Sequence, residues 1–224
     1  MRRAWRIIAV LGLLLAGGGW PSISPETAID RRPDYQAPAL LERAWALPLA
    51  ARLPRPPLPQ PNVSACGPTS VMNVGRALGQ PSLSLAELTS GESRCLRGLC
   101  LGGFTLDELA SLAARHVSGW QVTVVHPSSA TALREVLRAA PTKGQLVIAN
   151  FTRAPLFGRG GGHHSPLGGL LEPEDLVFVV DVNADYGPWL APTQRLFEAI
   201  DTTDPSSGEK RGLLIIEAAR PIDH

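Results

Sequence analysis

The chain has 224 residues, of which 44% are hydrophobic and 18% charged, and its formal net charge is +1. This length suits one domain with a leader, and the apolar content is enough for a single core. A net charge so close to zero lacks the basic excess of nucleic-acid-binding proteins, so we expect no nucleic acid as a partner.

Residues 1–20 have the pattern of a secretory signal peptide. Three arginines precede a short apolar run over residues 7–16, and three glycines follow it. The run is shorter than the about 20 apolar residues that a membrane-spanning helix needs. We therefore predict a secreted or periplasmic protein, and the alternative is a chain that an uncleaved leader anchors to a membrane.

Residues 21–59 are interpreted as a proline-rich lead-in to the domain. A short helix is expected within residues 39–49. Five prolines then fall within residues 53–61, and they favour an extended backbone typical of a semi-rigid linker. The domain itself is predicted to occupy residues 60–224.

Beyond residue 60 the pattern alternates between helices and strands. Ser84 and Thr105 are each followed three residues later by glutamate, which is the spacing of a capping box. Apolar periodicity and turn residues predict the remaining elements. Helices are expected at residues 67–78, 129–140 and 193–200, and strands at 120–125, 145–151, 163–171, 176–180 and 212–218. The strands at 163–171 and 176–180 form an antiparallel hairpin, and the whole predicts an α+β fold.

Cys66 stands immediately before the first of these helices. Unpaired backbone N–H groups and the helix dipole favour the thiolate there, and the thiolate is the nucleophilic form. Gln60 lies six residues upstream, where its amide and the Cys66 backbone N–H can stabilise an oxyanion. In an oxidising compartment Cys95 and Cys100 can form a disulfide, which leaves Cys66 as the free thiol. An inert buried cysteine is the alternative.

His163 is the preferred base for such a nucleophile. The predicted hairpin brings Asp181 close to it, and a carboxylate there would orient the imidazole and stabilise its charged form. Strand alternation turns His164 to the opposite face, so it is the fallback base. A zinc site built from Cys95, Cys100 and the histidines fits no tight ligand pattern, and we predict no metal site.

Several blocks of the chain resemble phytochelatin synthases, which are papain-like cysteine transpeptidases. The blocks are residues 60–67, 162–169, 181–182 and 189–216, and the resemblance covers most of residues 60–216. It implies a papain-like fold in which the helix with the nucleophile packs against an antiparallel sheet. It also implies that Cys66 is acylated, that His163 is the general acid and base, that Asp181 orients it, and that Gln60 is the oxyanion donor.

The resemblance further implies a substrate and the residues that bind it. Asn150 and Arg153 would hold the γ-glutamyl end of glutathione, and Arg211 would be a second substrate-binding arginine, since arginine pairs bidentately with carboxylates. The implied activity is that of a glutathione γ-glutamylcysteinyltransferase and peptidase. The partners are glutathione and, as a further candidate, a second copy of the chain. No cofactor is required, and heavy-metal ions would enter as glutathione thiolate complexes. A papain-like peptidase of the double-glycine leader type is the alternative.

Overall fold

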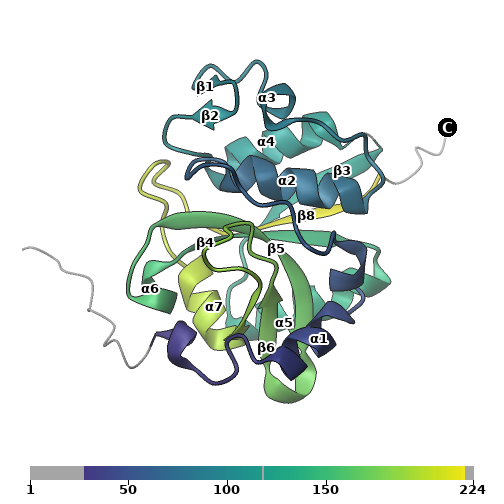
Figure 1. The fold of residues 1–224 in the computed structure, drawn as a ribbon, viewed down its shortest axis with the longest axis vertical. Helices are drawn as coiled ribbons and strands as arrows, with labels where there is room; N and C mark the ends of the chain where they lie inside the picture. Colours follow the sequence, from purple (N-terminus) through teal and green to yellow (C-terminus); the bar gives the residue numbers. More distant parts are fainter. Residues whose placement is uncertain (1–27, 118, 220–224) are drawn as a thin grey trace, which may run out of the picture.

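A six-stranded antiparallel sheet organises the chain in the computed structural model, which describes residues 28–117 and 119–219 (Figure 1). The strand order is β3-β8-β4-β5-β6-β7. The strands are β3 (Trp120–Val125), β4 (Leu146–Thr152), β5 (Gly162–Leu171), β6 (Leu176–Val179), β7 (Trp189–Pro192) and β8 (Leu213–Ala218). A separate hairpin consists of β1 (Cys95–Leu96) and β2 (Leu99–Cys100).

Helices pack on both sides of the sheet. Figure 1 shows α2, α3 and α4 on one side and α1, α5, α6 and α7 on the other. The helices are α1 (Pro38–Trp45), α2 (Cys66–Ala77), α3 (Leu85–Leu88), α4 (Leu106–His116), α5 (Ala130–Thr142), α6 (Ala154–Phe157) and α7 (Thr193–Ile200). Helix α2 packs against β5, and α4 packs against β3. The start of α2 therefore lies beside the strand that carries the two histidines.

The local signals in the sequence predict most of these boundaries. Both capping boxes are present, at Ser84 before α3 and at Thr105 before α4. The strand predicted at 120–125 and the helix at 193–200 have the predicted bounds. Helix α5 runs past Ala140 to Thr142 with Pro141 in its last turn. The strand β7 is not predicted, because it has only four residues and directly follows the turn-forming Gly187 and Pro188.

The lead-in is part of the domain, so the predicted boundary at residue 60 is too late. Ile29 and Leu49 are fully buried, and Leu53 is buried as well. The Leu58 backbone N–H donates to the Asn73 side chain of α2 at 2.8 Å. The prolines do extend this segment. However, the aliphatic residues near them are buried in the domain, whereas those of a solvated linker would be exposed.

The predicted signal peptide and the search for a membrane-spanning helix concern different parts of the chain. Residues 1–20, where the signal peptide is predicted, lie outside the described residues, and that prediction stays open. Within residues 28–117 and 119–219, no helix combines the length and the apolar character required to cross a bilayer.

Two adjacent glycines in β5 explain how the lead-in packs so closely. The pairing of β5 with β6 shifts register between Leu167 and Gly169, and Gly169 has φ +126°. A Cβ atom on Gly168 would lie 3.0 Å from the Ala50 Cβ, and one on Gly169 would lie 3.2 Å from a Leu47 methyl group. The glycines therefore make room for residues 47–50 on the strand.

Candidate active site

Cys66 is the first residue of α2 and is 7% exposed. The helix begins here because the turn at residues 62–65 closes with the Ala65 N–H on the Asn62 carbonyl oxygen. The thiol thus lies at the amide end of a twelve-residue helix, as predicted. Cys95 and Cys100 form a disulfide, so Cys66 is the free cysteine, also as predicted.

His163 lies on β5 and hydrogen-bonds through Nε2 to Asp181 Oδ1 at 2.9 Å. Asp181 comes two residues after β6 ends, so the antiparallel pairing of β5 with β6 produces the predicted neighbours. Ser165 Oγ lies 2.9 Å from the same ring nitrogen. The sequence analysis missed Ser165, although strand alternation places it on the same face as His163.

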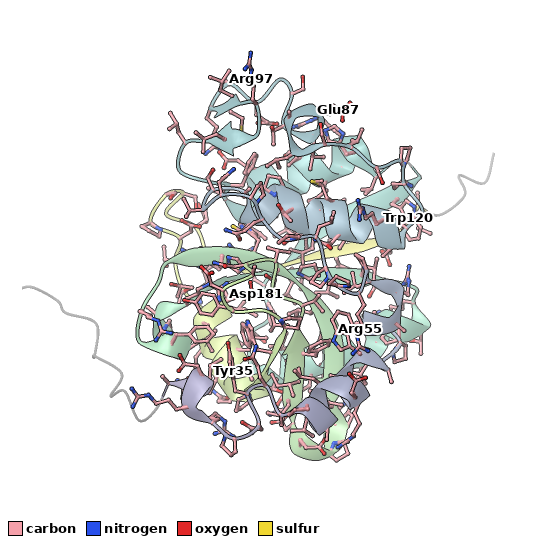
Figure 2. All side chains as sticks on the ribbon, viewed as in Figure 1. Tyr35, Arg55, Glu87, Arg97, Trp120 and Asp181 are labelled. Carbon is pink, nitrogen blue, oxygen red and sulfur yellow. A yellow bond between two sulfur atoms is a disulfide. The ribbon has the colours of Figure 1, made fainter. Side chains whose placement is uncertain are left out.

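Asp181 is buried and accepts hydrogen bonds from several groups; Figure 2 shows it in the interior of the molecule. Arg153 Nη2 donates to its two oxygens at 2.9 and 2.7 Å, Trp189 Nε1 donates at 2.7 Å, and the Asn183 backbone N–H donates at 2.8 Å. Burial raises the pKa of Asp181, but His163, Arg153 and Trp189 outweigh it and lower the pKa to about 2. The carboxylate is therefore ionised at neutral pH.

The same competition between burial and neighbours sets the charges of Cys66 and His163. Burial raises the pKa of the Cys66 thiol, but His163 and His164 together hold it well below its ordinary value. Burial lowers the pKa of His163, but Asp181 and Cys66 reverse this and raise it. Both shifts favour a Cys66 thiolate beside a His163 imidazolium, the ion pair in which a cysteine is most nucleophilic.

His164 also contacts Cys66, contrary to the expectation that alternation turns it away. Its Nδ1 lies 3.9 Å from Cys66 Sγ. The reason is that β6 pairs with β5 only from Leu167 onward, so the edge of β5 beside His164 is open. Helix α2 occupies this edge, where Ser70 Oγ donates to the His164 carbonyl oxygen at 3.1 Å. A thiol that approaches a strand from its edge can meet side chains of both faces.

A cavity of about 430 Å³ opens beside Cys66 and His164. The disulfide of the β1–β2 hairpin forms part of its wall through Cys100, and the loop after α7 contributes Asp204. This volume is that of a small-molecule site.

Two of the three predicted substrate-binding residues, Asn150 and Arg211, line this cavity. Arg211 Nη1 donates to Asp204 Oδ2 at 2.7 Å and to Asn150 Oδ1 at 3.4 Å, and its Nε is buried without a hydrogen-bond partner. A Cβ atom on Gly162 would lie 2.9 Å from Arg211 Nη1. Glycine at this position lets the guanidinium lie across the start of β5 and reach the cavity.

The third residue, Arg153, lies outside the residues that line this cavity. Its guanidinium bonds to Asp181 and lies over the Tyr186 ring, 3.8 Å from the ring centroid. Asp181 takes Nη2 of this guanidinium, whereas Nη1 is buried without a hydrogen-bond partner. Arg153 therefore supports Asp181, and its contact with substrate stays a prediction.

Gln60 bridges the segment before the nucleophile and the loop after Asp181. Its backbone N–H donates to the Val182 carbonyl oxygen at 2.7 Å, and its Nε2 donates to the Asn62 carbonyl oxygen at 2.9 Å. A side-chain amide carries two N–H donors. One hydrogen of Nε2 therefore remains for an oxyanion, and the role of Gln60 as oxyanion donor stays a prediction.

The comparisons with known proteins fit this geometry. A family model described as phytochelatin synthase matches residues 36–213. The chain is 30% identical over 118 residues to glutathione gamma-glutamylcysteinyltransferase 1 of Arabidopsis thaliana, a match of 51% of this chain and 24% of that protein. A relative with the same name from Triticum aestivum is 30% identical over 122 residues, covering 51% and 23%. The chain thus spans about a quarter of the length of these curated relatives.

A solved structure with a similar fold is the peptidase domain of Streptococcus ComA, a bi-functional ABC transporter involved in a quorum-sensing pathway. The TM-score is 0.50 at 15% sequence identity, over 72% of this chain and 97% of that domain. The likeness concerns the fold alone, and with it the predicted α+β papain-like fold is confirmed.

Proposed function

The chain belongs to the phytochelatin synthase family, and on that premise we propose that it is a glutathione γ-glutamylcysteinyltransferase and peptidase. The observation that carries the proposal is the place of Cys66, which starts a helix, contacts His164, lies beside a cavity lined by Arg211 and has its pKa lowered by His163 and His164. The names of the relatives from Arabidopsis thaliana and Triticum aestivum support glutathione as the substrate.

In the proposed reaction the Cys66 thiolate attacks the carbonyl carbon of the Cys–Gly amide of glutathione. The resulting oxyanion would accept hydrogen bonds from the Cys66 backbone N–H and from Gln60 Nε2. The C–N bond then breaks, and His163 gives its proton to the departing glycine amine. The product is a γ-glutamylcysteinyl thioester on Cys66 and a neutral His163.

The second half of the reaction regenerates the thiolate. Neutral His163 takes a proton from the acceptor, which attacks the thioester carbonyl while the C–S bond breaks. Water as the acceptor gives γ-glutamylcysteine, and the amine of a second glutathione gives a short phytochelatin. Asp181 keeps the imidazole oriented through both steps.

The cavity suits the γ-glutamyl end of glutathione, which carries a carboxylate and an ammonium group. The unpartnered Nε of Arg211 is a donor for the carboxylate, and Asn150 adds an amide beside it. The carboxylate of Asp204 is an acceptor for the ammonium group. This assigns Arg211 and Asn150 to substrate binding and Arg153 to the support of Asp181.

The scheme needs no bound cofactor, and heavy-metal ions would take part as thiolate complexes of the substrate. The disulfide removes Cys95 and Cys100 from any set of thiolate ligands. A homodimer stays a prediction.

The test is mass spectrometry of purified protein incubated with glutathione in the presence of a chelator, with Cys66→Ala as the control. We expect glycine and γ-glutamylcysteine to appear and the substitution to lower the rate by at least about a thousandfold. A short phytochelatin would add transfer to hydrolysis. Loss of hydrolysis in chelator, restored by metal, would overturn the metal-free scheme. No turnover with or without cadmium would exclude glutathione and favour a peptidase of the double-glycine leader type.

A further inference from the structure

We propose that His164 is a second catalytic histidine, whose Nδ1 hydrogen-bonds to the Cys66 sulfur: it donates to the thiolate when His163 holds the thiol proton, and it accepts that proton when His163 does not. The inference deepens the proposed function, because it concerns the same nucleophile. It does not depend on which amide that nucleophile attacks.

The first observation is that the backbones of Cys66 and His164 are fixed to one another. Ser70 Oγ lies 2.8 Å from the Cys66 carbonyl oxygen and 3.1 Å from the His164 carbonyl oxygen. Ser70 is fully buried and His164 is 2% exposed. One hydroxyl group on α2 therefore sets the distance between the helix start and the strand, and with it the 3.9 Å contact between Sγ and Nδ1.

The second observation is the absence of a side chain at Gly67. A Cβ atom there would lie 3.6 Å from His164 Nδ1 and 3.0 Å from a Leu109 methyl group. The imidazole and Leu109 fill the space next to the nucleophile. A Cβ atom at position 67 would press on Leu109 and only touch the ring, so glycine here lets Leu109 pack beside the imidazole, at a cost in helix propensity.

The third observation is that His164 Nε2 is buried and has no hydrogen-bond partner. An unpaired buried polar atom costs about 1–3 kcal/mol, and native proteins retain one mostly where function uses it. The His164 ring forms part of the cavity wall. One ring nitrogen thus meets Cys66, while the other is buried without a hydrogen-bond partner among the described residues.

The proton transfer is balanced within the protein. The S–H bond of Cys66 breaks and an N–H bond forms on His164 Nδ1, which gives a thiolate and an imidazolium without any further reactant. With His163 present, the proton resides mainly there, because Asp181 stabilises the charged form of His163 and no carboxylate hydrogen-bonds to His164 among the described residues. His164 then stabilises the thiolate by donating its Nδ1 hydrogen to the sulfur.

Charged groups from several elements face this pair. The start of α2 contributes the positive end of its dipole, and β5 contributes His163. Asp181 lies behind His163, and Asp204 and Arg211 face the cavity from the chain between α7 and β8. Arg211 opposes a charged His164, and Asp204 offsets part of that effect.

The test measures the rate of Cys66 alkylation by iodoacetamide as a function of pH, using the full chain and no glutathione. Cys95 and Cys100 are protected by their disulfide. The variants are His163→Asn, His164→Asn and the double variant, because an amide is similar in polarity but takes up no proton. The matched control is His116→Asn at the partly exposed end of α4.

We expect the midpoint of alkylation in His163→Asn to lie at least one pH unit below that of the double variant. The double variant should behave like an ordinary thiol, with a midpoint near about 8.5 or higher. His164→Asn should raise the midpoint relative to the wild type, and His116→Asn should not. If His163→Asn and the double variant have midpoints within one unit, or if His164→Asn matches the wild type, the proposal is wrong.

A second measurement covers variants that fail to fold. The ring of His164 is titrated by nuclear magnetic resonance in the wild type and in Cys66→Ala, and the two curves must differ for the proposal to hold. Neither measurement uses glutathione, so failure of the glutathione assay leaves this result intact, and failure here leaves the glutathione assay intact.

Discussion

Asp181 shows how much of the behaviour of a buried carboxylate is set by neighbours that the sequence does not reveal. Its pairing with His163 follows from hairpin geometry, which is local and readable from the order of the strands. Its bonds to Arg153 and Trp189 depend on how α6 and β7 pack, and no spacing rule predicts them. The sequence therefore predicts the neighbours His163 and Asp181, but not the ion pair between Arg153 and Asp181.

Replacing Arg153 with methionine separates the two assignments of this residue. Asp181 would lose a charged partner but keep His163 and Trp189, so we expect the free energy of unfolding to fall by about 3 kcal/mol. The orientation of His163 would suffer, so kcat should fall by at least about tenfold. The KM for glutathione should stay within about twofold. Steady-state kinetics and urea denaturation measure these three quantities.

The companion variant is Arg211→Lys, which keeps the charge beside Asp204 but loses the planar fork. Here we expect KM to rise by about tenfold, which corresponds to about 1.4 kcal/mol, with little change in kcat. An Arg153→Met protein with raised KM and unchanged kcat would instead support the substrate contact that the sequence predicts.

At the scale of elements, β5 carries two functions along its length. Its first half presents His163 and His164 to α2, and its second half accepts the lead-in at the glycine pair. Residues 47–50 of the lead-in lie at Gly168 and Gly169, further along the strand than the histidines. The packing of the lead-in therefore contributes to stability without touching the nucleophile.

Substituting Gly168 with alanine tests this division. The new Cβ would lie 2.4 Å from a ring carbon of Phe178, which is fully buried and cannot move aside. We expect the free energy of unfolding to fall by about 3 kcal/mol, at the upper end of the usual cost of overpacking. The control is Gly161→Ala, where nothing lies within 4 Å of the new atom. Thermal and urea denaturation of both variants should show a loss for Gly168→Ala only, and equal stabilities would contradict the packing described here.

Elements with strong local signals are the ones that the sequence predicts. Capping boxes predict the starts of helices α3 and α4, and a run of aliphatic and aromatic residues predicts β6. The sequence does not predict in the same way that residues 28–59 pack against the domain. Their prolines dictate an extended backbone, but whether an extended segment is solvated or packed depends on the surface that it meets.

For the molecule as a whole, the ionised Asp181 carboxylate makes the free energy of unfolding depend on pH in the acid range. Its pKa is about 2 in the folded protein and about 3.9 in an unfolded chain, so the folded state binds fewer protons between these values. The stabilisation is present above about pH 4 and is lost as the pH falls toward 2. It amounts to on the order of 2 kcal/mol.

The measurement is urea denaturation of the wild type and Asp181→Asn at several pH values from 5 to 2. We expect the wild type to lose about 2 kcal/mol more than the variant over this range. Parallel loss in both proteins would mean that the Asp181 carboxylate has no special stability in the folded state.

The complete site is an outcome of the whole fold. Cys66 and Gln60 come from the segment after the lead-in, and His163 and Arg211 follow about 100 and 145 residues after Cys66. The sequence predicts these residues singly and through family resemblance. It misses that His164 shares the nucleophile, because the open edge of β5 arises only from the register of three strands and a helix.

Ser70 joins the start of α2 to β5 only in the folded protein, so the reactivity of Cys66 differs between the unfolded and the folded chain. The two histidines that activate Cys66 are about a hundred residues away from it along the chain. A nascent or unfolded chain therefore carries three thiols of ordinary reactivity, and none of them is distinguished as a nucleophile. Cys66 becomes a reactive nucleophile when α2 packs against β5, so the chain does not attack amides until it has folded.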